Sequence, residues 1–144
     1  SRRKKDVPYR YFDNLTEMAR ACDALICITP GGPSTHKIVN AEVLEALGPN
    51  GTLINVSRGS VVDEAALIAA LTSGKLGWAG LDVFEAEPVV PQALRDLPNT
   101  VLLPHVGSAT VETRAAMGAL TVDNLLQHLK DGTVMTPVPE CADL

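Results

Sequence analysis

The stretch TLINVSRGSVVDEAALIAAL, residues 52–71, combines a strand, a turn and a helix in twenty consecutive positions. Residues 52–56 are an apolar run of strand length, which predicts a short and largely buried strand. Gly59 predicts a turn after it, and Asp63 is a suitable N-cap for a helix that ends before Gly74. The apolar face of this helix consists of Leu67, Ile68 and Leu71. The stretch therefore predicts one strand–helix unit of an α/β protein.

The rest of the chain repeats this alternation of strands and helices. Further apolar strands are predicted at residues 24–28, 78–84 and 100–103, and further helices at 15–22, 41–47 and 111–131. Asn14, Asn40 and Thr110 precede these helices as capping residues. The last helix offers four leucines as core candidates: Leu120, Leu125, Leu126 and Leu129. Apolar runs on both faces of these strands, in alternation with amphipathic helices, predict an α/β fold with a mostly parallel sheet.

Composition argues against several classes of function. The 144 residues carry a net charge of −5, which gives no general attraction to nucleic acids or anionic membranes. No apolar run approaches transmembrane length, and no apolar segment follows the basic start as in a signal peptide. Cys22, Cys27 and Cys141 form no C-x-x-C or Cys/His cluster, which favours free thiols and no metal site. We expect a soluble cytoplasmic protein that binds neither nucleic acid nor membrane.

The beginning of the chain lacks the usual opening of a doubly wound sheet. Such a sheet starts with a strand and a glycine-rich turn that binds phosphate. Here residues 1–5 are the polar, basic SRRKK, and no G-x-G-x-x-G occurs in the 144 residues. Two interpretations stay open: a small complete α/β domain, or the later part of a larger one.

Charged side chains follow three of the predicted strands. Arg58 follows the strand at 52–56, Asp82 and Glu87 belong to the next strand and its loop, and His105 follows the last strand. In an open parallel sheet the carboxyl ends of the strands share one edge, where ligands bind. An arginine can hold a carboxylate there, and an imidazole beside a carboxylate can exchange a proton near neutral pH. Taken singly, each residue could instead be a solvated turn or loop residue.

Three segments carry a resemblance to a known family: INVSRGSVVDEAALIAAL, GLDVFEAEP and LLPHVGSATVETR. In this order and spacing they resemble consecutive signatures of the D-isomer-specific 2-hydroxyacid dehydrogenases, and most of all the glyoxylate/hydroxypyruvate and hydroxyphenylpyruvate reductases. The resemblance implies the later part of a Rossmann-type, doubly wound sheet whose first strands and glycine-rich turn are missing. Residues 1–144 would then be a partial dinucleotide-binding domain, with residues 110–144 as its C-terminal helix and tail and the substrate domain absent.

The resemblance also implies roles for individual residues. Arg58 matches the family's catalytic arginine, His105 its acid/base histidine and Glu87 the glutamate that pairs with this histidine. Asp82 matches the acidic residue that contacts the nicotinamide amide. Glu85 is an alternative to Glu87, but the spacing to the following proline and the family pattern favour Glu87.

Cofactor contacts are implied at Ser1, Arg2, Arg3, Pro30, Val56, Ser57 and Asp82. In the family, the residues just after the second strand meet the adenosine ribose, where an acid suits NAD and an arginine suits the 2′-phosphate of NADP. The start of the chain offers one hydroxyl and two guanidinium groups, so NADP is the expected cofactor and NAD the alternative. A solvated terminus is the simpler interpretation of these first residues.

The resulting prediction is an NADP-preferring reductase of a small 2-oxo acid, such as glyoxylate or hydroxypyruvate, that yields the D-2-hydroxy acid and is a homodimer when intact. The alternative is a scaffold of the same family that senses nicotinamide dinucleotides, similar to transcriptional corepressors, without physiological turnover. The presence of Arg58, Glu87 and His105 together favours the enzyme. Residues 1–144 alone are expected to be inactive, because they lack the pyrophosphate-binding turn and the opposite wall of the site.

Overall fold

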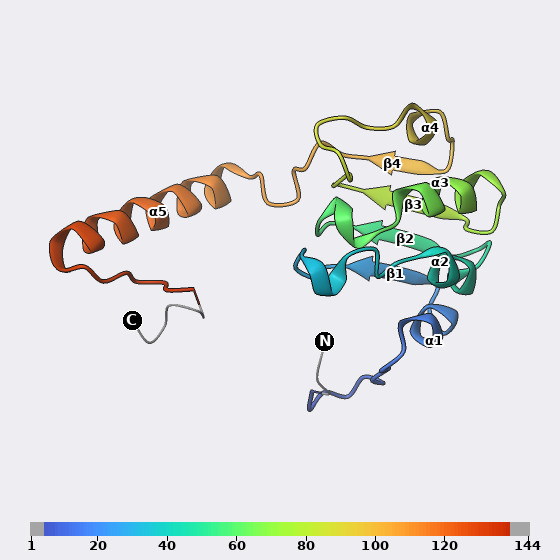
Figure 1. Ribbon diagram of the computed structural model, residues 1–144, viewed down its shortest axis with the longest axis horizontal. Coiled ribbons are helices and arrows are strands. Elements are labelled where there is room, and N and C mark those ends of the chain that lie inside the picture. Colours follow the sequence, from blue (N-terminus) through green and yellow to red (C-terminus); the bar gives the residue numbers. More distant parts are fainter. Residues whose placement is uncertain (1–4, 139–144) are drawn as a thin grey trace. The chain divides into compact units, whose positions relative to one another are not determined.

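A computed structural model describes residues 5–138 in two units, which we treat separately. The unit that ends at His105 contains one four-stranded sheet, and the unit that begins at Val106 contains one long helix (Figure 1). The strands are β1 (Ala24–Cys27), β2 (Thr52–Asn55), β3 (Trp78–Leu81) and β4 (Thr100–Leu102). All neighbouring pairs are parallel and the strands lie in chain order, which confirms the predicted parallel α/β sheet.

Helices precede and connect these strands. They are α1 (Leu15–Arg20), α2 (Ala41–Leu47), α3 (Glu64–Thr72) and the short α4 (Gln92–Arg95), with 3-10 turns at Pro33–Thr35 and Gly59–Val61. The predicted caps are present at the first three helices. The side chains of Asn14, Asn40 and Asp63 each accept a hydrogen bond from the backbone N–H three residues later, at 3.0, 3.1 and 3.2 Å. Each cap satisfies a backbone donor that the helix itself leaves unpaired.

The core lies on one side of the sheet. Leu25 and Leu53 point from the strands into it, and Val43, Leu44, Leu67 and Leu71 reach it from α2 and α3. The opposite side of the sheet exposes large apolar side chains, namely Ile26, Val56, Trp78, Val101 and Leu103. The strands are therefore apolar on both faces, as predicted, and the helices within residues 5–138 cover one of these faces.

The strands are shorter than the apolar runs that predicted them. β3 ends at Leu81, three residues before the predicted end, although Val83 and Phe84 are also buried. β1, β2 and β4 each end one residue early. An apolar run indicates that residues are buried, but it does not indicate whether their backbone pairs with another strand. A buried loop after a strand therefore has the same sequence pattern as the strand.

The second unit is dominated by α5 (Val111–Asp131). Its N-cap is Thr110, as predicted, and Gly132 ends it in the left-handed conformation with φ 81°. The segment after the helix returns along it, since Asn124 Oδ1 accepts hydrogen bonds from the N–H groups of Met135 and Thr136 at 2.9 and 3.1 Å. None of the helices within residues 5–138 is long and apolar enough to cross a membrane.

The four leucines predicted as core residues of α5, Leu120, Leu125, Leu126 and Leu129, are exposed. Within the unit that begins at Val106 these side chains therefore do not form a core, and the prediction is wrong for that unit.

Candidate functional site

The loops that follow the four strands begin side by side at one edge of the sheet. Backbone hydrogen bonds continue beyond the strand ends, from Val56 N–H to the Cys27 carbonyl at 3.3 Å and from Asp82 N–H to the Asn55 carbonyl at 2.9 Å. A third links Leu103 N–H to the Leu81 carbonyl at 2.8 Å. The predicted site residues within the described chain all belong to these loops: Pro30, Val56, Ser57, Arg58, Asp82, Glu87 and His105. Ser1, Arg2 and Arg3 lie outside the described residues.

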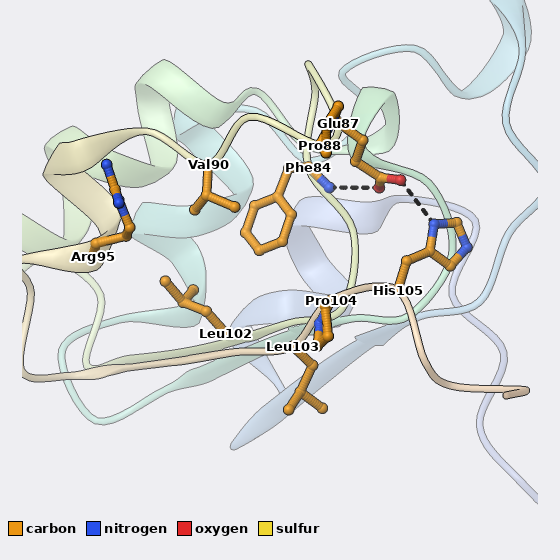
Figure 2. Close-up of a pocket in the computed structure, with 9 residues that line it drawn as sticks. All are labelled: Phe84, Glu87, Pro88, Val90, Arg95, Leu102, Leu103, Pro104 and His105. Atoms are coloured by element: carbon orange, nitrogen blue, oxygen red, sulfur yellow. Dashed lines mark hydrogen bonds and ion pairs between the residues drawn. The ribbon is translucent and has the colours of Figure 1, made fainter. Parts of the chain in front are cut away.

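Glu87 and His105 form a hydrogen-bonded pair. Glu87 Oε2 lies 2.8 Å from His105 Nδ1, and Glu87 Oε1 accepts a hydrogen bond from Phe84 N–H at 2.9 Å (Figure 2). The hydrogen bond from His105 is the largest cause that lowers the pKa of Glu87, followed by the Phe84 N–H, and Arg58 adds a smaller Coulombic contribution. An ionised Glu87 requires the proton of His105 to lie on Nδ1. The other ring nitrogen, Nε2, is then the atom that can exchange a proton with a ligand.

The lowered pKa of Glu87 fixes the pH range of this pair. A carboxyl group whose pKa is lower in the folded state stabilises the fold above its ordinary range, and this contribution is lost as the pH falls through the lowered value. The pair is therefore intact at neutral pH and breaks only in acid.

The backbone of His105 is unusual. Its φ is 57°, in the left-handed region that residues other than glycine rarely adopt. Such a conformation costs about 1–3 kcal/mol and persists where surrounding contacts determine it. Here the residue lies three positions after the end of β4, and its ring is turned toward Glu87.

Glu85, the alternative partner for the histidine, makes a different contact. Its carboxylate lies 3.6 Å from the Lys37 ammonium, which also lies 3.7 Å from Asp63. The structure thus places Glu87 beside the imidazole, and it places Glu85, which also follows β3, against Lys37 of the loop after β1.

Arg58 is exposed in the loop after β2, and its side chain lies against the loop after β1. A Cβ atom on Gly31 would lie 3.0 Å from Arg58 Cγ, so the side chain packs against this glycine. Its Nη1 donates a hydrogen bond to the Ser57 carbonyl at 2.6 Å. Within residues 5–138 no carboxylate forms an ion pair with Arg58. The guanidinium therefore keeps its capacity to hold an anionic ligand.

Asn55 organises the turn that carries Arg58, a role that the sequence did not predict. The side chain is 1% exposed, and its Oδ1 accepts hydrogen bonds from the N–H and hydroxyl of Ser57 at 3.1 and 2.8 Å. Its Nδ2 donates to the Arg58 carbonyl at 3.0 Å. Ser57, a predicted cofactor contact, is thus buried and held by Asn55. The only signal in the sequence is an amide at the end of an apolar strand.

Gly59 brings the turns after β2 and β3 into backbone contact. A Cβ atom on it would lie 1.9 Å from the Phe84 carbonyl oxygen, a distance that no side chain tolerates. The loop that carries Arg58 and the loop that carries Glu87 are therefore packed directly against each other.

A cavity of about 450 Å³ lies behind the pair of Glu87 and His105. Phe84 and Val90 form one wall, Leu102 the other, and Arg95 lies at the far end (Figure 2). The second ring nitrogen of His105 points away from this cavity (Figure 2). A ligand that contacts Nε2 would therefore lie on the other side of the imidazole.

The described cysteines have no catalytic arrangement. Cys22 and Cys27 are free thiols, and burial raises the pKa of Cys27 to about 11, which keeps it neutral. Cys141 lies outside the described residues. In residues 5–138 no cluster of three histidine, cysteine or acidic side chains is placed to hold a metal ion.

Comparisons with known proteins give consistent matches. Residues 1–107 match the family model for the NAD-binding domain of D-isomer specific 2-hydroxyacid dehydrogenases. The chain is 52% identical over 136 residues to hydroxyphenylpyruvate reductase of Plectranthus scutellarioides, and 51% identical over 135 residues to a glyoxylate/hydroxypyruvate reductase of Arabidopsis thaliana. Each match covers 94% of this chain but 44% and 43% of the relative. The chain thus spans less than half the length of these relatives.

Among solved structures, the chain is similar to the NADPH-dependent glyoxylate/hydroxypyruvate reductase of Sinorhizobium meliloti in complex with NADP and malonate. The TM-score is 0.95 at 55% identity, over 97% of this chain and 44% of that chain. A 2-hydroxyacid dehydrogenase from Ketogulonicigenium vulgare matches with a TM-score of 0.90 at 46% identity, over 96% of this chain and 44% of that one.

Proposed function

Since the chain belongs to the D-isomer specific 2-hydroxyacid dehydrogenase family, we propose that the protein containing it is an NAD(P)-dependent oxidoreductase that reduces a 2-oxo acid to the D-2-hydroxy acid. The observation that carries this proposal is the 2.8 Å contact between Glu87 and His105 at the sheet edge where Arg58 also lies. The named activities of the similar reductases support glyoxylate and hydroxypyruvate as the substrate class.

In this reaction His105 supplies the proton and Glu87 orients the imidazole. The hydride that adds to the carbonyl carbon comes from the reduced nicotinamide when it is bound. Nε2 of the protonated imidazole gives its proton to the carbonyl oxygen, which becomes the hydroxyl group. The Nδ1 proton stays on the ring, held by Glu87 Oε2, so the histidine ends the step neutral and in one defined tautomer.

Arg58 supplies the binding of the substrate carboxylate. A guanidinium presents two parallel N–H donors that match the two carboxylate oxygens. The positive charge also favours the negative charge that develops on the adjacent carbonyl oxygen. Packing against Gly31 and the bond to the Ser57 carbonyl restrict the orientations of this side chain before the substrate binds.

The residues at the sheet edge fit a nicotinamide ring. Val56 is 46% exposed and Pro30 is exposed as well, so both offer apolar surface to a planar ring. Asp82 is a buried carboxylate at the end of β3, the type of group that accepts hydrogen bonds from an amide NH₂. Gly32, with φ 126°, has no atom within 4 Å of the position of a Cβ, so its backbone can approach a ligand closely. These residues would hold the nicotinamide end of the cofactor.

NADP is proposed as the preferred cofactor, on the strength of Arg2 and Arg3 at the start of the chain. Replacing both by alanine in the intact protein is expected to lower kcat/KM for NADPH by about 10–100-fold, because charge-assisted bonds to the 2′-phosphate are lost. The value for NADH should change little. The matched control is the double alanine variant of Lys4 and Lys5. An equal loss with both cofactors would contradict the assignment.

The proposed activity is tested by following NADPH oxidation by the intact protein with glyoxylate, hydroxypyruvate and hydroxyphenylpyruvate. Saturable oxidation that depends on the 2-oxo acid is the expected result. If none of the three acids increases the rate at which the protein oxidises NADPH or NADH, the reductase assignment is wrong.

Two properties of the intact protein complete the proposal. The intact protein is proposed to associate into a homodimer, which sedimentation equilibrium would show as twice the mass of one subunit. The composition of the chain, with three cysteines outside any C-x-x-C motif, supports a reducing compartment such as the cytoplasm, which imaging of a tagged protein would test.

A further inference from the structure

Two glutamates hold consecutive amide groups of the turn after β3. Phe84 N–H donates to Glu87 Oε1 at 2.9 Å, and Glu85 N–H donates to Glu64 Oε2 at 3.2 Å. Glu87 belongs to the turn itself. Glu64 is half-buried, lies 21 positions earlier in the sequence and opens α3 directly after its N-cap Asp63. The turn is therefore fixed from outside by a residue of a neighbouring helix.

The same turn is fixed from a second side by Gly59. The position of a Cβ on this glycine lies 1.9 Å from the Phe84 carbonyl oxygen and 2.5 Å from the Glu85 nitrogen. The peptide group between Phe84 and Glu85 thus lies against Gly59 while its N–H is held by Glu64. A rotation of this peptide would break the bond to Glu64 and move the backbone of Glu87, two residues further on.

We propose that Glu64 is a positioning residue for the pair of Glu87 and His105: its carboxylate fixes the Phe84–Glu85 peptide against Gly59, and this places Glu87 Oε2 at hydrogen-bond distance from His105 Nδ1. Glu64 acts through the backbone of the turn, since its contact is with Glu85 N–H. The catalytic consequence rests on the proposed function, whereas the geometric consequence does not.

Lys37 supports this arrangement electrostatically. Its ammonium lies 3.6 Å from the carboxylate of Glu85, whose N–H donates to Glu64, and 3.7 Å from the carboxylate of Asp63, the residue before Glu64. Its own N–H donates to the Ser60 carbonyl at 2.8 Å, which ties the loop after β1 to the loop after β2. Ion pairs at this level of exposure contribute little each, so the hydrogen bond to the Glu85 amide is the more specific contact.

A simpler role for Glu64 makes a different prediction. Acidic residues in the first turn stabilise a helix through its dipole, and Glu64 is the acidic residue in the first turn of α3. Two substitutions separate the roles. Glu64→Asp keeps the charge at the helix terminus but withdraws the oxygen from the Glu85 amide by one methylene. Glu64→Gln removes the charge but keeps an acceptor oxygen at the same reach.

The kinetic arm uses the intact protein, with NADPH and hydroxypyruvate. Positioning predicts that Glu64→Asp lowers kcat by about tenfold with KM changed by less than about twofold, because misplacing a catalytic group slows the chemical step. Glu64→Gln should keep kcat within about twofold of the parent value, since the acceptor is retained. Glu42→Asp is the matched control, because Glu42 is the acidic residue in the first turn of α2. A fast aspartate variant with a slow glutamine variant would overturn the proposal in favour of the dipole role.

The second arm needs no turnover. The pKa of Glu87, lowered by its contacts with His105 and Phe84, can be followed by carbon NMR of the side-chain carboxyl group without substrate. Glu64→Asp should raise this pKa toward the ordinary glutamate value, while Glu64→Gln and Glu42→Asp should leave it lowered. An unchanged pKa in Glu64→Asp would refute the positioning role. A shifted pKa in a protein without reductase activity would instead uphold the positioning role and refute the proposed function.

Discussion

Replacement of His105 by asparagine is expected to reduce kcat for 2-oxo acid reduction in the intact protein by ~10²–10⁴-fold, the usual contribution of a general acid. Asparagine retains a side-chain donor that can bond Glu87 but has no proton that it can release near neutral pH. KM for the 2-oxo acid should change little, because Arg58 is left to bind its carboxylate.

Steady-state rates of NADPH oxidation across a range of hydroxypyruvate concentrations measure this effect. His36→Asn is the matched control, since His36 lies exposed in the loop after β1 and ends the turn Pro33–Thr35. A loss of kcat below about tenfold in His105→Asn would mean that another group supplies the proton.

Replacement of Arg58 by alanine is expected to lower kcat/KM by about 10²–10³-fold, since two charge-assisted hydrogen bonds to the substrate carboxylate are lost. The loss should appear as a large rise in KM together with a lower kcat, because the same charge favours the developing oxyanion. Arg58→Lys should recover little of it, since an ammonium cannot reproduce the two parallel donors of a guanidinium.

The matched control is Arg95→Lys. Arg95 is a second arginine, and its guanidinium donates a hydrogen bond to Gln92. Rates at several concentrations of glyoxylate and hydroxypyruvate separate the effects on KM and kcat. Near-normal kinetics of Arg58→Lys would identify Arg58 as a solvated turn residue and remove it from the proposed mechanism.

Local features of the fold were predictable from the sequence because local residues determine them. Asn14, Asn40, Asp63 and Thr110 all cap the helices that they precede, and each cap depends on contacts within three residues. The parallel sheet followed from apolar runs that alternate with helices. The ends of the strands did not follow, because Val83 and Phe84 are buried in a loop and are as apolar as strand residues.

The part of the site that depends on contacts between loops was not predictable. Asn55 and Gly59 sit in the segment whose motif pointed to Arg58, yet their roles appear only once the turn and its neighbour are in contact. Glu64 has an ordinary place at the start of a helix, and its bond to the Glu85 amide joins residues 21 positions apart. A single sequence contains no signal for such a contact, because it depends on how two successive strand–helix units pack together.

The sequence also did not predict what covers the second face of the sheet, the one that the described helices leave exposed. Side chains alternate across a strand, so the apolar runs correctly indicated two apolar faces. The described residues cover one of them, and Trp78 and Val101 remain exposed on the other. The alternation of apolar residues indicates that a face of the sheet is apolar, but it does not indicate which segment covers that face.

We propose that the intact protein reduces a 2-oxo acid to one enantiomer of its hydroxy acid at the sheet edge formed by Arg58, Glu87 and His105. Chiral chromatography of the product that the intact protein forms from hydroxypyruvate and NADPH tests it most directly. We predict that D-glycerate is the sole product, formed in a one-to-one ratio with the NADPH consumed. Formation of L-glycerate or of a racemic mixture, or consumption of NADPH without glycerate, would show that the site does not catalyse the proposed reaction.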